Sequence, residues 1–418
     1  MNLAAKSIRA ERTLGRFERV RARSRALCST LEPEDFCLQS MPDASPPKWH
    51  LAHTTWFFET FVLKHFGADY PAPHPAFEVL FNSYYKGVGE AFTRAQRGLL
   101  TRPVLEEVWR YRAVIDEAIP ALVQSLKGPA LEDALTRIEL GANHEEQHQE
   151  LLLTDMLHGF AQSPLQPALR PDAVSPEGAT APLHWHERPE AIVAMGHAGA
   201  CFHFDNEGPR HRTLVPAHAL ASRLASNGEY LAFMEDGGYR RPELWLSAGW
   251  AWVEENRLEA PLYWERDGQG WTRFRLDGRH SVVGAAPVTH LSYFEADAFA
   301  RWSGARLPTE AEWEALAHDV PVQGNLLECE SYGPQVGEGQ WFGDCWEWTS
   351  SSYAPYPGYR PLPGTLGEYN GKFMCNQYVL RGGSFATGRE HIRSTYRNFF
   401  PTHARWQFSG VRLAKDAA

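Results

Sequence analysis

His144 and His148 form the strongest chemical signal in the sequence, because they lie four residues apart in a segment free of Pro and Gly over residues 144–158. Such a segment is predicted to be helical, and at about 100° per residue the two imidazoles lie only about 40° apart on one helix face. Two imidazoles on one face suit a metal held inside a helical bundle. The same spacing also suits two polar histidines on a half-exposed helix, so a third ligand is needed to decide.

The residues around this pair narrow the possible chemistry. Gln147 precedes the second histidine and is predicted to face the same cavity, whereas Glu150 falls nearly opposite and is excluded as a ligand. The segment formally matches the His-Glu-x-x-His motif of zinc proteases, in which Glu145 would be the general base. Leu151 and Thr154 stand where the longer protease motif needs Gly and turn residues, which disfavours a protease.

A second aromatic-rich helix is predicted to open near Lys48 and to supply the third ligand. Trp49, His53 and Phe57 recur every four residues and share one face, so His53 is the inward-facing candidate. His50 is its rival, three residues earlier. A lone histidine on an aromatic face is more often a core residue than a ligand. Three imidazoles suit Zn, Cu, Fe and Ni alike, so this chemistry does not select the metal.

The elements that must position these side chains divide the chain into two parts. Residues 1–163 are predicted to form an up-and-down four-helix bundle, residues 164–183 a linker rich in Pro, Ser and Ala, and residues 184–418 a domain of short strands and turns. The predicted bundle helices span 7–31, a segment from 48 onwards, 103–126 and 128–158, and the second domain is predicted to contain only two helices, at 292–303 and 309–318. The fold class is therefore α+β.

Composition restricts the partners and the compartment. The chain of 418 residues carries a net charge of −10, which disfavours nucleic acid and anionic membranes as partners. No stretch approaches the ~20 apolar residues of a membrane span. Six scattered cysteines without a Cys-x-x-Cys pair indicate reduced thiols and a cytoplasmic protein. No phosphate loop or dinucleotide motif is present, and the sequence leaves the oligomeric state open.

The second half of the chain carries five motifs in a fixed order that resemble one family. They resemble the formylglycine-generating and sulfatase-modifying enzymes, which implies a C-type-lectin-like fold with little regular structure. Many of their Gly, Trp and Arg residues can be explained by a structural role alone. The motifs are Phe-Asp-Asn-Glu at 204–207, Pro-Val-Thr-His-Leu-Ser at 287–292, Arg-Leu-Pro-Thr-Glu-Ala-Glu-Trp-Glu at 306–314, Asp-Cys-Trp-Glu-Trp-Thr at 344–349 and Arg-Gly-Gly-Ser-Phe at 381–385.

The N-terminal helices, which precede this second half, resemble a DinB-like bundle. The combination resembles the ergothioneine-biosynthesis sulfoxide synthases (EgtB family). These are non-haem iron oxidoreductases that use O₂ to join a thiol sulfur to carbon 2 of the imidazole of hercynine (trimethylhistidine). The resemblance implies one Fe(II) held by His53, His144 and His148.

The same resemblance implies how the thiol substrate binds. Arg94 and Arg97 match the arginine pair that holds its carboxylate, and Tyr84 and Tyr85 match the tyrosine pair of the cysteine-using branch, one of which acts as proton donor. Which of the two tyrosines donates stays open, because adjacent side chains point to opposite sides of an extended segment whereas a turn allows both to face the site.

Hercynine contacts are implied at two further places. Gln147 matches the glutamine placed against the trimethylated substrate, and Asn398, Phe399 and Phe400 match a C-terminal loop that closes over it. Phe400 takes the place of an Asp linked to γ-glutamylcysteine, which favours free cysteine as the donor.

Two alternatives remain beside the cysteine-using synthase. A selenoneine synthase would take a selenosugar instead of cysteine within the same architecture. A member of another class would be a lectin-like binding protein whose bundle holds a structural zinc. The presence of the arginine pair, Tyr84 and Gln147 argues against that second alternative.

Overall fold

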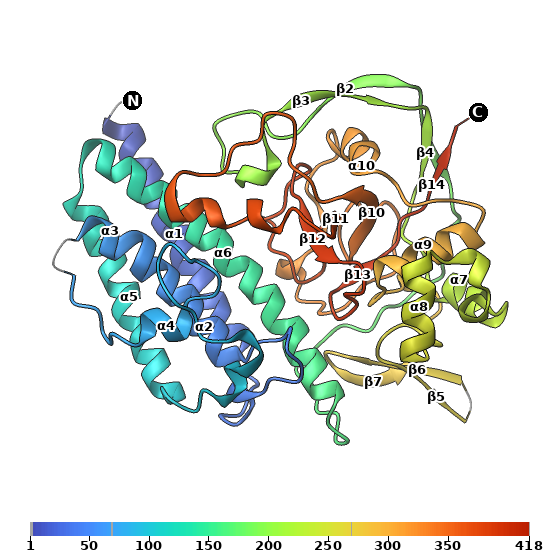
Figure 1. Ribbon diagram of the computed structural model, residues 1–418, viewed down its shortest axis with the longest axis horizontal. Helices are drawn as coiled ribbons and strands as arrows, with labels where there is room; N and C mark the ends of the chain where they lie inside the picture. The colour runs from blue at the N-terminus through green and yellow to red at the C-terminus, as the bar shows by residue number, and fades with distance from the viewer. Residues whose placement is uncertain (1–2, 68–69, 269, 418) are drawn as a thin grey trace. The chain divides into compact units, whose positions relative to one another are not determined.

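The computed structural model describes residues 3–67, 70–268 and 270–417, and the chain forms two compact units (Figure 1). The first unit comprises Met1–Gln162 together with Pro363–Glu368, and the second comprises Ser163–Leu362 and Tyr369–Ala418. All three histidines predicted to bind metal therefore belong to the first unit.

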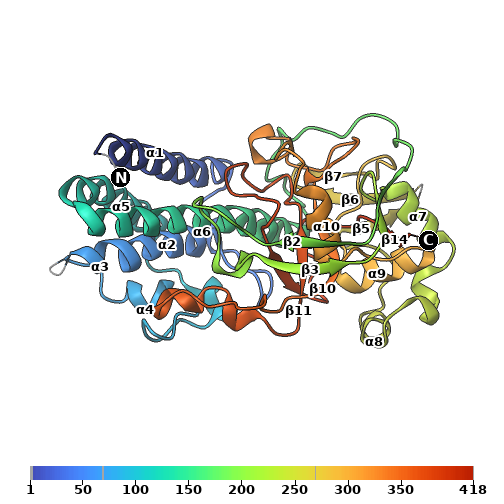
Figure 2. The same cartoon turned by 90° about the horizontal axis from the view of Figure 1, so that it is seen from above.

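Four long helices build the first unit, which confirms the predicted helical bundle. Figure 2 shows α1, α2, α5 and α6 running alongside one another. Their bounds are Leu3–Leu27 for α1, Pro47–Phe58 for α2, Leu105–Ser125 for α5 and Gly128–Ala161 for α6. Between α2 and α5 the chain forms a π-helix at Glu59–Leu63, two short helices, α3 (Lys64–Phe66) and α4 (Phe77–Phe81), and a 3₁₀ helix at Arg94–Leu99.

Local sequence explains where α2 begins and how closely α6 packs on it. Pro47 occupies the first turn of α2, where a missing N–H costs no helical hydrogen bond. Gly141 of α6 faces Phe58, and a Cβ at that position would lie 2.5 Å from Cε1 of the phenyl ring. The two helices that carry the histidines therefore pack in close contact, with a glycine at the point of approach.

The second unit consists of small sheets joined by loops and short helices. Its largest sheet has the order β12-β11-β10-β13, and the β10–β13 pair is parallel. The strands of this sheet span Trp346–Ser352 (β10), Gln377–Arg381 (β11), Asn398–Pro401 (β12) and Ser409–Gly410 (β13). The other sheets contain β1 (Trp185–Arg188), β4 (His218–Ala221) and β14 (Ala414–Asp416); β2 (Ala191–Met195) and β3 (His211–Val215); β5 (Trp264–Asp267), β6 (Gly270–Arg275) and β7 (Gly278–Ser281); and β8 (Gly324–Asn325) and β9 (Phe342–Gly343).

The prediction of only two helices in this unit is wrong. The expected helices appear as α9 (Tyr293–Trp302) and α10 (Glu310–Ala317), but α7 (Asn227–Glu235) and α8 (Ser247–Asn256) are also present. Their apolar residues form one unbroken run, at 230–234 in α7 and at 250–253 in α8, and do not recur at helical spacing, which is why periodicity missed both helices. The capping box of Ser226 and Glu229 at the start of α7 was the available signal.

Buried ion pairs interlock the motifs of the second unit. Arg381 is fully buried and donates to Glu310 at 2.9 Å and Glu314 at 3.0 Å. The Trp313 indole donates to Glu347 at 2.7 Å. These contacts join three of the five motifs, and they support the structural role expected for many of their residues.

Candidate metal centre

Three histidines from two helices converge inside the bundle. His53 of α2 lies close to His144 and His148 of α6. One ring nitrogen of each histidine lies within 4.8 Å of the corresponding nitrogens of the other two. The ring centroids are 4.9 Å apart for His53 and His144, 4.7 Å for His53 and His148, and 4.6 Å for His144 and His148. Within the described parts of the chain this is the only such group of three possible ligands.

The surroundings keep these imidazoles neutral. Burial is the main cause that lowers the pKa of His53 and His148 well below 6.5, and the neighbouring histidines lower both further. Burial likewise lowers the pKa of His144 to about 3, although the charge of Glu145 opposes the shift. A metal binds the deprotonated imidazole nitrogen, so three neutral, convergent rings fit a divalent metal ion.

Hydrogen bonding and stacking fix the orientation of His53. Its Nδ1 lies 2.6 Å from the carbonyl oxygen of Phe81, which can accept but not donate, so Nδ1 carries the proton and Nε2 is left as the ligand atom. The ring stacks on Trp49, with centroids 4.5 Å apart and an interplanar angle of 11°. The aromatic face predicted for α2 therefore holds a ligand in place.

His50, the rival of His53, lies beside the group and not in it. Its Nδ1 is 2.8 Å from Nδ1 of His148, and its Nε2 is 3.1 Å from Oδ2 of Asp155. The sequence did not predict this arrangement, because it depends on Asp155, two turns beyond His148 on α6. Gln147 is half-buried on the same helix.

Glu145 does not act as the base of a zinc protease in this structure. It accepts hydrogen bonds from Arg112 at 2.8 Å and Arg21 at 2.9 Å, and from the hydroxyl of Ser24 at 2.5 Å. Burial alone would raise its pKa, but the two guanidinium groups lower it to about 2. The carboxylate thus anchors α1, α5 and α6, and it is too weakly basic to accept a proton near neutral pH.

Arg97 is a buried cation close to the histidines. Its guanidinium carbon lies 3.3 Å from the ring centroid of Trp49, the residue that stacks on His53. It donates to the hydroxyl of Ser45 at 2.9 Å, while its Nε has no hydrogen-bond partner, and no carboxylate of a described residue pairs with it. Burial, and next the charge of Arg94, lower its pKa to about 8. A buried guanidinium without a carboxylate is suited to bind an anionic ligand.

Arg94 differs from its partner in the predicted pair. Its side chain is exposed and donates to the backbone carbonyl of Asp43. The two arginines share a 3₁₀ helix, but only Arg97 is buried next to the aromatic wall of the histidine group.

Tyr84 and Tyr85 lie in a turn and stack on each other. Their ring centroids are 4.7 Å apart with an interplanar angle of 29°, so the two side chains do not point to opposite sides. Asn82 forms the turn, because its side chain accepts from the backbone N–H of Tyr85 at 3.2 Å and donates to the carbonyl of Tyr85 at 3.1 Å. Tyr85 is fully buried with its ring 5.7 Å from that of Trp56, whereas Tyr84 is half-buried.

Asn398, Phe399 and Phe400 belong to strand β12 of the second unit, so the expected loop is a strand here. Phe399 pairs with Val379 of β11, and its ring stacks on Tyr353 with centroids 4.0 Å apart. All three side chains are half-buried.

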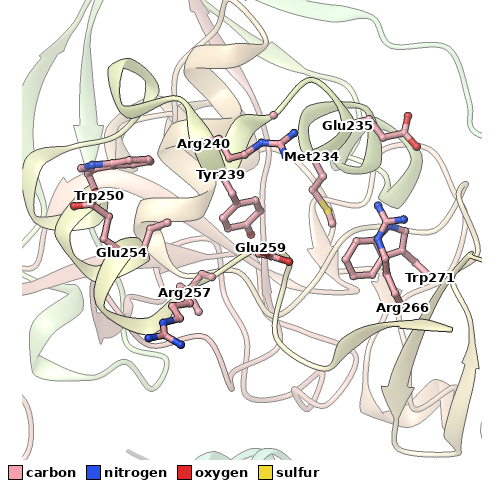
Figure 3. A pocket seen from close by; sticks show the side chains of 13 residues that line it. Met234, Glu235, Tyr239, Arg240, Trp250, Glu254, Arg257, Glu259, Arg266 and Trp271 are labelled. Carbon is pink, nitrogen blue, oxygen red and sulfur yellow. The ribbon is translucent and has the colours of Figure 1, made fainter. Parts of the chain in front are cut away.

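A separate pocket of about 420 Å³ lies in the second unit, and the sequence did not predict it (Figure 3). Trp250 and Trp271 contribute aromatic walls, and charged side chains of both signs surround the opening, among them Arg257 and Glu259. This balance of charge selects no ligand class.

No helix within the described ranges is long and apolar enough to cross a bilayer.

Comparisons with known proteins follow the two-unit architecture. Residues 16–153 match the DinB superfamily, and residues 187–325 and 330–417 match the sulfatase-modifying factor enzyme 1-like domain. The chain is 31% identical over 425 residues to the hercynine oxygenase of Mycobacterium tuberculosis, with 95% of this chain and 97% of that protein covered. It is 32% identical over 419 residues to the hercynine oxygenase of Mycolicibacterium thermoresistibile, with 90% and 88% covered.

The second half alone is also similar to another group. The formylglycine-generating enzyme of Streptomyces coelicolor is 28% identical over 287 residues, with 55% of this chain and 88% of that enzyme covered. The hercynine oxygenases named above combine both halves over nearly their whole length, which confirms the resemblance drawn from the motifs. The chain belongs to the hercynine oxygenase family.

Proposed function

We propose that this oxygenase is an Fe(II)-dependent, cytoplasmic sulfoxide synthase that joins the sulfur of cysteine to carbon 2 of the hercynine imidazole with O₂. The observation that carries the proposal is the group of three convergent, neutral histidines, two buried and His148 half-buried, in a chain of this family. His53, His144 and His148 would hold the iron. When bound, the iron supplies open coordination positions for a thiolate and for O₂, and a redox centre for their reaction.

Arg97 is the residue proposed to select the thiol substrate. Its buried guanidinium provides charge-assisted hydrogen bonds to a carboxylate, and Trp49 links it to the wall of the metal centre. Arg94 adds positive charge from the surface side and has the smaller role. Phe400, in place of an Asp, supports free cysteine as the donor.

Tyr84 and Tyr85 are proposed to control protons at the site. A tyrosine with an ordinary pKa of about 10 keeps its proton at neutral pH and can donate it to a developing anion. Tyr85 of the stacked pair lies against Trp56, which itself stacks on His53 with centroids 5.6 Å apart. One of the two phenols would deliver the proton that directs the reaction toward C–S bond formation.

Hercynine recognition needs aromatic faces and an amide. A quaternary ammonium group donates no hydrogen bond and binds by cation–π contact, for which Phe399 and Tyr84 are suited. Gln147 would hydrogen-bond the substrate from the metal-bearing helix, and Asn398 and Phe400 of β12 are proposed as further hercynine contacts on the family resemblance alone.

The experiment is to reconstitute the enzyme anaerobically with Fe(II), supply hercynine and O₂ with a panel of thiols and selenols, and identify products by mass spectrometry. Cysteine should give the C–S sulfoxide. His148→Ala should lose both iron and turnover, whereas Glu150→Ala should keep both, because its helical position faces away. A preference for a selenium donor would favour a selenoneine synthase, and zinc retention without turnover would favour a binding protein.

A further inference from the structure

We propose that His50 and Asp155 form a positioning relay that holds His148 in the tautomer and orientation needed to bind metal. Neither residue belongs to the ligand group. The inference rests on the metal centre proposed above and adds two residues to it.

The relay is a continuous line of hydrogen-bonded groups inside the bundle. Nδ1 of His148 lies 2.8 Å from Nδ1 of His50, and Nε2 of His50 lies 3.1 Å from Oδ2 of Asp155. His50 is 3% exposed and Asp155 is 6% exposed. The contact of His50 with Asp155 is therefore shielded from water, which strengthens it and makes its loss costly, and the contact of His50 with the half-buried His148 is partly shielded.

The chemistry of the last acceptor fixes every proton in the line. A carboxylate oxygen is the acceptor for an N–H, so Nε2 of His50 donates to Asp155, which leaves Nδ1 of His50 as the acceptor toward His148. The Nδ1 of His148 is then the donor, and its proton-free Nε2 is the atom left for a metal. With the opposite tautomer, His148 would carry a proton on the atom that faces the metal.

Asp155 is itself held in place by the backbone. Its Oδ2 also accepts from the N–H of Ser45 at 2.8 Å, and the Ser45 hydroxyl accepts from Arg97 at 2.9 Å. The carboxylate is thus fixed from the segment before α2 as well as by His50. Ser45 therefore connects Asp155, the last residue of the relay, to Arg97, the cation proposed to bind the thiol substrate.

The two sides of the metal centre use different acceptors behind their ligands. The Nδ1–H of His53 donates to the backbone carbonyl of Phe81, 2.6 Å away. Behind His148 stand the imidazole of His50 and then the carboxylate of Asp155. A carboxylate behind a ligand histidine raises its basicity and orients its ring, and loss of such support typically weakens metal affinity ~10–100-fold.

The test measures metal affinity, with Co(II) as an optical probe under anaerobic conditions. The variants are His50→Phe, His50→Gln and Asp155→Asn. A glutamine can accept from His148 through its carbonyl and donate to Asp155 through its amide, so it preserves the direction of the relay. The control is His65→Gln, which alters an exposed His–Asp pair in the same unit, with His65 and Asp133 3.4 Å apart.

His50→Phe should weaken Co(II) binding ~10–100-fold, and His50→Gln should restore most of the loss. Asp155→Asn should weaken binding and shift the Co(II) spectrum, while His65→Gln should match the wild type. Thermal unfolding without metal separates a loss of fold from a loss of support, because a purely structural role would lower Tm and leave the affinity of the folded fraction unchanged.

Co(II) affinity and spectrum equal to wild type in both His50→Phe and Asp155→Asn would overturn the relay. The relay would also be overturned if His148→Ala retains the metal while His50→Phe loses it, because His50 would then be the ligand. If the wild-type protein binds neither Co(II) nor Fe(II), the proposed metal centre fails and the relay fails with it.

Discussion

Arg97 is the residue whose surroundings say most about the substrate. It is 4% exposed, has no carboxylate partner among the described residues, and contacts Trp49 next to the histidine group. A bound carboxylate would neutralise the buried charge. The sequence predicted the residue through its resemblance to the family, but its burial depends on Trp49 and Ser45, which are distant along the chain.

Arg97→Ala should raise the KM for cysteine about ten- to a hundredfold, because a charge-assisted hydrogen bond contributes ~1.5–3 kcal/mol. Arg94→Ala should have a smaller effect, since that side chain is exposed. Hercynine affinity measured without thiol should change little in either variant. Arg110→Ala, at an exposed pair with Glu106, is the control. An unchanged cysteine KM in Arg94→Ala and Arg97→Ala would show that this pocket is assigned wrongly.

The tyrosine pair has a prediction of its own. Replacing the active phenol with Phe removes a proton donor and leaves the ring, so iron and substrates should still bind while product shifts from sulfoxide toward cysteine sulfinate. The measurement is the ratio of the two products in Tyr84→Phe, Tyr85→Phe and the double variant. A ratio that stays at the wild-type value in all three would exclude both phenols from control of the reaction.

At the scale of elements, Glu145 ties three helices of the bundle together. Its contacts with Arg21 of α1 and Arg112 of α5 hold α6 in the position that presents the histidines. Sequence periodicity predicted these helices, because their apolar patterns repeat over several turns. It did not predict α7 and α8, whose apolar residues form one consecutive run each, or the turn at Asn82, which depends on side-chain-to-backbone hydrogen bonds.

Glu145→Gln should destabilise the metal-free protein by about 3–5 kcal/mol near neutral pH, because two buried guanidinium groups lose their counter-charge. The folded pKa of Glu145 is lowered from 4.5 to about 2. Its contribution is therefore fully present above pH 4.5 and is lost as the pH falls toward 2. Urea unfolding of wild type and variant over this range should show the difference narrowing. A difference independent of pH would contradict the assignment, and Glu106→Gln, at an exposed pair, is the control.

On the scale of the whole molecule, a segment from far along the chain completes the first unit. Pro363–Glu368 groups with the bundle, and the Glu368 carboxylate accepts from the backbone N–H groups of Lys86 at 3.0 Å and Gly87 at 2.8 Å. These residues directly follow the tyrosine pair. Local sequence patterns carry no information about a contact between residues some 280 positions apart, so this part of the candidate site was not predictable.

The central claim is that the three-histidine centre couples O₂ to C–S bond formation between cysteine and hercynine. The most direct test follows O₂ consumption and product together in the Fe(II)-reconstituted enzyme, with isotopically labelled O₂. We predict one labelled C–S sulfoxide formed for each O₂ consumed, and neither without iron or with His148→Ala. O₂ consumption that yields only oxidised cysteine in the wild-type enzyme, or sulfoxide formed equally well without iron, would contradict the claim.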